Sequence, residues 1–328
     1  MKTLFKPLAC ALVTTVWSVA ALAQTTSPAP AFPTKPVRIV VPFGAGGVAD
    51  LTVRAVAQKL SDTWGQAVIV DNKPSAGGVV AGEMVAKADA DGHTLLLMSN
   101  GSAVSAGLFK NLPFDTKRDF APLSTLGFFD IGIVVANESK FATLADALNY
   151  AKANPGKLNI GSIAVGSTQN LAAELFKSSA EIDAQVVPFN GTPAVITALR
   201  GGQIDLALEI IAPITGQIKG KSLRLLATTG DKRSRLLPDM PTTRELGVLG
   251  LNAASWNALA APAKTPKAIQ IRLARDIAAA VDSADVRAKL AEQQVDASSA
   301  SPELTAELLA NEIKRWGAVI ERAKIARQ

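Results

Sequence analysis

Short apolar runs alternate along this chain with amphipathic helical patterns, and loops rich in small residues join them. The first such unit is a strand pattern over Val37–Phe43, a loop over Gly44–Gly47 and a helix expected over Asp50–Trp64. Apolar residues recur in that helix every three or four positions, which indicates one buried face, and Gly65 is typical of a helix stop. Strands that alternate with helices predict mainly parallel, doubly wound sheets flanked by helices, so we expect an α/β fold.

The same unit recurs in a second block between residues 143 and 227, and a mostly helical C-terminal part follows. Two blocks, with the C-terminal part returning to the first, predict two lobes joined by crossings near Phe129–Val135 and Ala253–Ala260. The predicted boundaries are 34–132 together with 254–328 for lobe 1, and 133–253 for lobe 2.

The N-terminus has the pattern of a secretory signal peptide. Two lysines near the start precede an apolar run over Leu8–Ala20, and small residues at positions 21 and 23 suit cleavage after Ala23. The run is shorter than the roughly 20 apolar residues of a membrane span, although an uncleaved anchor is the alternative. We therefore expect a signal peptide over 1–23, a flexible leader over 24–33, and a mature protein in the periplasm.

Composition excludes several classes of site. The single cysteine, Cys10, lies in the predicted signal peptide, so the mature chain has no disulfide, cysteine nucleophile or metal–thiolate site. The only histidine, His93, precedes a strand and is expected to be structural, and a zinc site needs several such ligands. The formal net charge is +6, or +4 without Lys2 and Lys6, with no basic cluster typical of nucleic-acid binding. We expect no cofactor, no metal and a monomer.

Four loops follow predicted strands and precede helices, where open α/β sheets bind their ligands. They are Gly44–Gly47, Ser75–Gly78, Gly166–Gln169 and Asn190–Thr192. Glycines let backbone N–H groups approach a ligand, and a helix N-terminus attracts a carboxylate or phosphate. The alternatives are structural: the glycines serve tight packing, the hydroxyls at Ser167 and Thr168 cap a helix, and Asn190 belongs to a capped turn. Neither a dinucleotide fingerprint nor a P-loop is present.

Two acidic residues and one tryptophan lie near these loops. Glu209 ends a predicted strand, where it either faces the crevice and binds a ligand amine or hydroxyl, or is a surface charge. It would oppose a second ligand carboxylate unless it were protonated or paired. Asp50 lies in a first helical turn, where an acid favours the helix dipole, with a ligand role as the alternative. Trp256 either lines the cleft or belongs to the core or hinge.

An ordered set of motifs covers nearly the whole mature chain. The motifs are P-V-R-I-V-V-P-F-G-A-G-G at 36–47, D-N-K-P-S-A-G-G at 71–78, D-G-H-T-L-L at 91–96, D-F-A-P-L at 119–123, A-N-P-G-K-L at 153–158, G-S-T-Q-N-L-A at 166–172, P-D-M-P-T at 238–242, and S-W at 255–256 with A-P at 261–262. Each is weak alone, but the set resembles the Bug family, the extracytoplasmic receptors of tripartite tricarboxylate transporters.

The resemblance implies a two-lobed, type II-like periplasmic-binding-protein fold that closes over one ligand in the cleft. Family ligands are amino acids, di- and tricarboxylates or aromatic acids, delivered to an inner-membrane permease. The family pattern places a ligand carboxylate on the first two glycine loops, and lobe 2 contributes a hydroxyl-rich loop and a strand end. With Asp50 and Asn190 from the loop analysis, the candidate ligand-binding residues are Phe43, Gly44, Gly46, Gly47, Asp50, Gly77, Gly78, Ser167, Thr168, Gln169, Asn190 and Glu209.

Several positions depart from the family pattern. The family usually has Pro at Ala45, Ser or Asn at Val48, and Asn at Val79; Tyr-Lys-Gly is Phe189-Asn190-Gly191 here, and the usual Asp is Glu209. The anion site can tolerate these changes, because its donors are mainly backbone N–H groups. Val48 and Phe189 make the pocket less polar, which favours an aromatic or aliphatic acid over citrate.

Two other functions are alternatives to transport. A receptor whose closed form docks on a membrane sensor kinase would share the binding step. A periplasmic hydrolase would need an activated nucleophile and a base. Ser167 has no evident partner for that role, the mature chain has no cysteine, and its one histidine precedes a strand. We therefore expect a binding protein and not an enzyme.

Overall fold

The computed structural model describes residue 1 and residues 32–234, 236–322 and 325–328. The predicted signal peptide and its cleavage site lie outside the described residues, apart from residue 1. The last two residues of the predicted leader belong to the described fold. Phe32 is buried there, with its ring centroid 6.3 Å from that of Trp64 and 4.9 Å from that of His93.

Ten strands form one continuous sheet in the order β2-β1-β3-β9-β4-β7-β5-β6, with β8 and β10 also paired to β4. Their bounds are β1 Val37–Val41, β2 Val68–Asn72, β3 Thr94–Ser99, β4 Phe120–Ala136, β5 Leu158–Ile163, β6 Ala184–Phe189, β7 Leu206–Ile210, β8 Leu223–Thr228, β9 Ala254–Pro262 and β10 Asp296–Ala297.

The sheet has two halves, and β4 runs through both. In the first half β1 pairs in parallel with β2 and β3, and in the second half β5 pairs in parallel with β6 and β7. β4 pairs with β9 from Phe120 to Asp130 and with β7 and β8 from Ile131 to Ala136. β4 runs from the first half to the second and β9 runs back, so these two strands are antiparallel. The sheet is therefore mixed.

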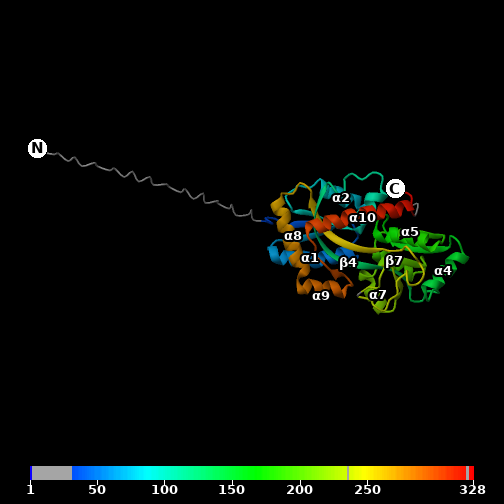
Figure 1. Ribbon diagram of the computed structural model, residues 1–328. Coiled ribbons are helices and arrows are strands. Elements are labelled where there is room, and N and C mark those ends of the chain that lie inside the picture. The colour runs from blue at the N-terminus through cyan, green and yellow to red at the C-terminus, as the bar shows by residue number, and fades with distance from the viewer. Residues whose placement is uncertain (2–31, 235, 323–324) are drawn as a thin grey trace. The chain divides into compact units, whose positions relative to one another are not determined.

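Helices cover the sheet, as the strand–helix alternation predicted. Their bounds are α1 Val48–Trp64, α2 Val79–Ala86, α3 Asn100–Leu108, α4 Leu144–Ala153, α5 Thr168–Ala180, α6 Thr192–Arg200, α7 Thr215–Lys219, α8 Lys267–Asp282, α9 Ala284–Glu292 and α10 Pro302–Arg322, with short 3-10 turns at Ala76–Gly78 and Ala212–Ile214. Figure 1 shows α1, α8 and α9 beside the first half and α4 and α7 beside the second, while α10 packs along α3 and β4.

The first helix illustrates how the sequence pattern produces the packing. The predicted apolar face of α1 is confirmed, because Val53, Val56 and Leu60 are fully buried. The helix begins two residues earlier than predicted, at Val48, and ends at Gly65, which adopts the left-handed conformation with φ 63°. That φ favours glycine and terminates the helix, as predicted.

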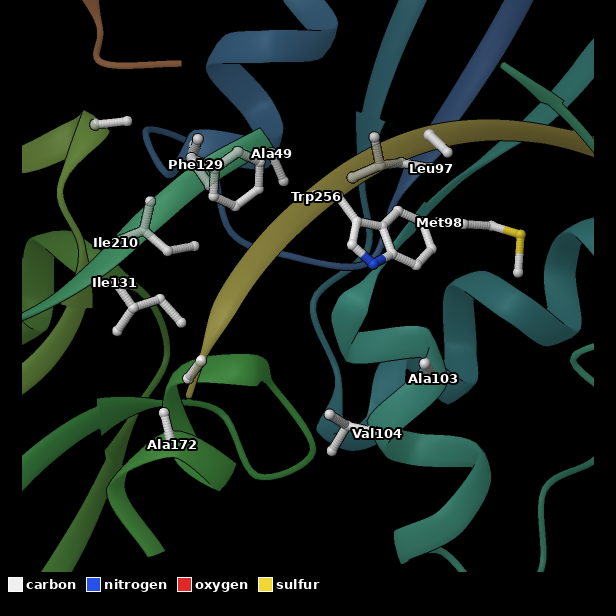
Figure 2. Close-up of a cluster of buried hydrophobic side chains, with 14 of the residues drawn as sticks. Ala49, Leu97, Met98, Ala103, Val104, Phe129, Ile131, Ala172, Ile210 and Trp256 are labelled. Carbon is white, nitrogen blue, oxygen red and sulfur yellow. The ribbon is translucent and has the colours of Figure 1, made fainter. Parts of the chain in front are cut away.

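The larger of two clusters of buried apolar side chains extends across both halves of the sheet, and the smaller one lies in the second half. Figure 2 shows Trp256 from β9 among buried apolar side chains from both halves of the sheet, including Met98 and Ile210. Trp256 is buried and therefore belongs to the core, one of the alternatives that the sequence left open. In the part of the chain that the structure describes, no helix has the length and apolar character of a membrane span.

Candidate ligand-binding site

Four helices begin around one small cavity between the two halves of the sheet. α1 and α3 start there from the first half, and α5 and α6 start there from the second. The cavity has a volume of about 30 Å³ and is lined by Phe43, Gly47, Val48, Ala49, Ser99, Phe129, Ile163, Thr168, Gln169, Thr192, Ile210, Ser255 and Asn257. Because the first N–H groups of a helix have no partner within it, the cavity lies in a positive backbone field that suits an anion.

At the N-terminus of α1, backbone N–H groups that no side chain caps lie at the cavity. Its N-cap is Gly47, which has extended backbone angles and no side chain to accept hydrogen bonds from the first turn. Val48 and Ala49 at the helix start both line the cavity. A ligand carboxylate at this position would accept hydrogen bonds from the first N–H groups of α1, as the side chain of an Asp or Ser N-cap does in other helices.

Asp50 holds the first glycine loop in shape and does not line the cavity. Its Oδ2 accepts a hydrogen bond from the Gly46 N–H at 3.0 Å, and its Oδ1 accepts one from Arg54 Nε at 2.9 Å. Arg54 also donates to Asn72, whose Nδ2 donates to the Phe43 carbonyl at 3.0 Å. Burial raises the pKa of Asp50, but the hydrogen bonds from Arg54 and Gly46 outweigh burial and hold that pKa below its ordinary value.

The second glycine loop contacts the other half of the sheet. Gly77 and Gly78 have φ of 65° and 66°. The Gly77 N–H donates to the Val165 carbonyl at 3.1 Å, and Ser105 Oγ donates to the Gly166 carbonyl at 3.2 Å. Gly77, Gly78 and Ser167 line a second cavity of about 30 Å³, whose wall includes Phe43. These residues thus meet where the two halves touch, next to the first cavity.

Glu209 lies behind the wall that α5 and α6 contribute to the cavity. It is 1% exposed, so the interpretation as a surface charge is wrong. Its Oε1 accepts hydrogen bonds from Gln169 Nε2 at 3.0 Å, from Thr192 Oγ1 at 3.1 Å and from the Ile210 N–H at 3.0 Å. Its Oε2 is buried without a hydrogen-bond partner among the described residues. Burial raises the pKa of Glu209 to about 7 despite these three hydrogen bonds.

The structure divides the twelve candidate residues into three groups. Phe43, Gly47, Thr168 and Gln169 line the first cavity, while Gly77, Gly78 and Ser167 line the second. The residues that line neither are Gly44, Gly46, Asp50, Asn190 and Glu209. In this last group, a Cβ atom on Gly44 would lie 3.1 Å from the Asn190 carbonyl oxygen, so these two loops pack directly on each other.

Sequence reasoning missed several cavity residues on β3, β4 and β9. Ser99 lies at the end of β3 and caps α3 by accepting a hydrogen bond from the Gly101 N–H. It therefore lies at a strand–helix junction, like the four loops that the sequence indicated. Ser255 and Asn257 alternate along β9 and so face the cavity together, on the side opposite Trp256. Asn257 Nδ2 is buried without a partner among the described residues. No local motif marks this residue, because it lies within an apolar strand.

The one histidine lies away from both cavities. His93 accepts a hydrogen bond at Nε2 from the Thr34 N–H at 3.3 Å, and its backbone N–H donates to Asp91 at 2.9 Å. It lines neither cavity. These contacts agree with the structural role expected from its position before a strand.

Comparisons with known proteins identify what the chain is similar to. A family model described as "Tripartite tricarboxylate transporter family receptor" matches residues 52–325. Protein BugT of Bordetella pertussis is 33% identical over 291 residues, which are 88% of this chain and 89% of BugT.

Two solved structures from Rhodopseudomonas palustris share the fold. Rpa4515 with adipate is 31% identical, with a TM-score of 0.86, and the match covers 90% of this chain and 99% of that one. MatC with bound malate is 29% identical, with a TM-score of 0.83, and the match covers 88% of this chain and 100% of that one.

Proposed function

This chain belongs to the tripartite tricarboxylate transporter receptor family, and we propose that it captures one small carboxylate in the cleft between its two lobes. The resemblance to Bug receptors is confirmed by the match to BugT, and the predicted periplasmic-binding-protein fold by the solved structures. The family consists of solute-binding receptors rather than enzymes, and we infer that this chain performs no reaction on its ligand. It would deliver the carboxylate to a tripartite tricarboxylate-type permease.

One observation carries this proposal: four helices, two from each half of the sheet, begin at the same buried cavity. Their N-termini place positive backbone charge around the cavity, which attracts an anionic ligand. The apolar wall of Phe43, Phe129 and Ile163 would contact the carbon skeleton. The relatives whose structures contain adipate and malate make a small organic acid the natural candidate.

Ligand entry requires the two lobes to separate. We place lobe 1 at 34–132 with 254–328 and lobe 2 at 133–253, since the pairing of β4 changes between Asp130 and Ile131. A cavity of about 30 Å³ admits a few water molecules only. The contacts of Gly77 with Val165 and of Thr168 Oγ1 with Ser255 Oγ, at 3.3 Å, close the cleft over it. A carboxylate would enter an open form and be enclosed as these contacts form.

The ligand site proposed here combines direct contacts with supporting residues. Phe43, Gly47, Thr168 and Gln169 would contact the ligand, together with Ser99, Ser255 and Asn257. Gly44, Gly46, Asp50 and Asn190 would shape the first glycine loop and its contact with lobe 2, and Gly77, Gly78 and Ser167 would form the lobe contact. We also propose export to the periplasm by a signal peptide cut after Ala23.

The test is a thermal-unfolding screen of the mature protein against carboxylic acids, each paired with its uncharged primary amide. A ligand at 100 times its dissociation constant stabilises the folded state by about 2.7 kcal/mol. We expect at least one acid to raise the melting temperature and its amide to leave it unchanged. If no acid raises it in protein from which any co-purified ligand has been removed, or if amides act equally well, the proposal is wrong.

A further inference from the structure

The cavity wall formed by α5 and α6 is oriented by one buried carboxyl group. Gln169 Nε2 and Thr192 Oγ1 both donate to Glu209 Oε1, and both residues line the cavity. The Ile210 N–H, which is fixed in the backbone, donates to the same oxygen at 3.0 Å. Oε1 therefore acts as an acceptor whether or not the carboxyl group carries a proton, since a proton would be on Oε2. The Gln169 amide must accordingly turn its nitrogen toward Glu209.

This orientation determines which atoms remain for a ligand. With Nε2 bonded to Glu209, Gln169 keeps its carbonyl oxygen Oε1 for a ligand. With its hydroxyl hydrogen directed to Glu209, Thr192 keeps only lone pairs. The lobe 2 wall thus offers hydrogen-bond acceptors to the cavity.

The opposite wall offers donors. Val48 and Ala49 contribute the free N–H groups at the start of α1. Asn257 on β9 is 1% exposed, and its Nδ2 has no partner in the described part of the chain. One end of the cavity therefore suits a carboxylate, and the other suits a group that donates a hydrogen bond.

We infer that Glu209 is a positioning residue that makes this receptor prefer acids with one carboxylate and a hydrogen-bond donor at the far end over dicarboxylates. This inference rests on the proposed carboxylate-receptor function. The donor is a hydroxyl, amide or ammonium group, and Gln169 and Thr192 accept its hydrogen bond. Glu209 acts through these two side chains and does not line the cavity itself.

A second ligand carboxylate would be disfavoured for two reasons. It would place acceptors against the acceptors of Gln169 and Thr192, leaving both sides unpaired in a buried site. It would also approach the Glu209 carboxylate, and among the described residues no basic side chain forms an ion pair with Glu209 that would offset the repulsion.

The experiment compares acids that differ only at the far end. Three frameworks, butane, hexane and benzene, each supply a diacid, a monoacid with a far hydroxyl group and a monoacid with a far hydrogen or methyl group. Calorimetric titration of the mature protein at about pH 8 gives the affinity of each, with Glu209 mostly ionised. On the framework that binds best, we expect the hydroxy acid to bind about tenfold or more tightly than the diacid.

Two variants separate positioning from general stability. Glu209→Gln removes the charge that repels a second ligand carboxylate, so we expect the ratio of hydroxy-acid to diacid affinity to fall about tenfold. Glu174→Gln on the same helix α5 is the matched control, because Glu174 pairs with Lys177 outside the cavity and should leave that ratio unchanged.

The outcomes distinguish this inference from the proposed function. A wild-type protein that binds diacids as tightly as hydroxy acids, or a Glu209→Gln ratio equal to that of wild type, overturns the role of Glu209 while the receptor function stands. Failure of every acid to bind overturns the receptor function itself, and this inference with it.

Discussion

The backbone N–H of Gly77 donates a hydrogen bond to the carbonyl oxygen of Val165 at 3.1 Å, which joins the loop after β2 to the loop after β5. The two residues belong to different halves of the sheet, so this bond exists only while the halves are in contact. Gly77 has φ of 65°, and a Cβ atom there would lie 2.6 Å from the Phe109 ring. The conformation and the close approach both require glycine.

Gly77→Ala should destabilise the folded protein and disturb the contact that closes the cleft. The left-handed conformation and the contact with Phe109 together should cost about 1–3 kcal/mol. Urea unfolding measures the loss, and ligand titration should show weaker binding. Gly216→Ala in α7 is the control, since a Cβ atom there meets nothing within 4 Å and its φ is not positive. Equal effects of the two substitutions would contradict the role given to Gly77.

Gly47→Asp should strongly weaken ligand binding without unfolding the protein. An Asp at this N-cap would accept the α1 N–H groups in place of the ligand and repel its carboxylate. A Cβ atom at Gly47 meets its nearest neighbours at 3.8 and 3.9 Å, which is ordinary contact. We expect affinity to fall more than about tenfold while the helix gains up to about 1 kcal/mol. Gly47→Ala should keep most of the affinity, and retained binding by the Asp variant would place the carboxylate elsewhere.

Asp50→Asn should loosen the first glycine loop. The amide group would present a donor to either the Gly46 N–H or Arg54, both of which now donate to the carboxylate. Loss of one buried charge-assisted hydrogen bond should cost about 1–3 kcal/mol in urea unfolding and weaken ligand binding. Asp62→Asn on the exposed face of α1 should change stability by less than about 0.5 kcal/mol. A weakened ligand site with unchanged stability would instead indicate direct ligand contact by Asp50.

Glu209 should make the folded state less stable as the pH rises. Its pKa is about 7 in the folded protein and 4.5 as a free group, so between these values the folded state retains a proton that the unfolded state has lost. The stability it contributes is complete below about pH 4.5 and disappears as the pH passes 7, a change of about 3 kcal/mol. The unfolding free energy of wild type minus that of Glu209→Gln should therefore decrease as the pH rises from about 4.5 to above 7. A difference that does not vary with pH would mean that Glu209 ionises normally.

Some secondary-structure elements of this protein could be predicted from the sequence pattern alone. The strand–loop–helix unit around Gly44–Gly47 and the apolar face of α1 are encoded by residues close together in the sequence. The capping box at the start of α4 is equally local, since Thr143 and Asp146 exchange both of its hydrogen bonds across three residues. Such elements are specified within a few residues of each other.

The rest depends on contacts between distant segments. The burial of Glu209 results from α5 and α6 closing over the end of β7, which no pattern around residue 209 reveals. Asn257 faces the cavity only because β9 lies between β3 and β4 with a particular register. Asp50 was rightly placed in the first turn of a helix, but its bond to Gly46 depends on how the loop folds back.

The passage of β4 through both halves of the sheet gives the cleft a mechanical character. Seventeen residues from Phe120 to Ala136 form this one strand, and the return connection leads directly into β9. Because β4 is hydrogen-bonded into both halves, a separation of the proposed lobes would have to bend or twist this strand. Any change in the angle between the proposed lobes would then be shared by the paired peptide groups of β4 on either side of Asp130 and Ile131.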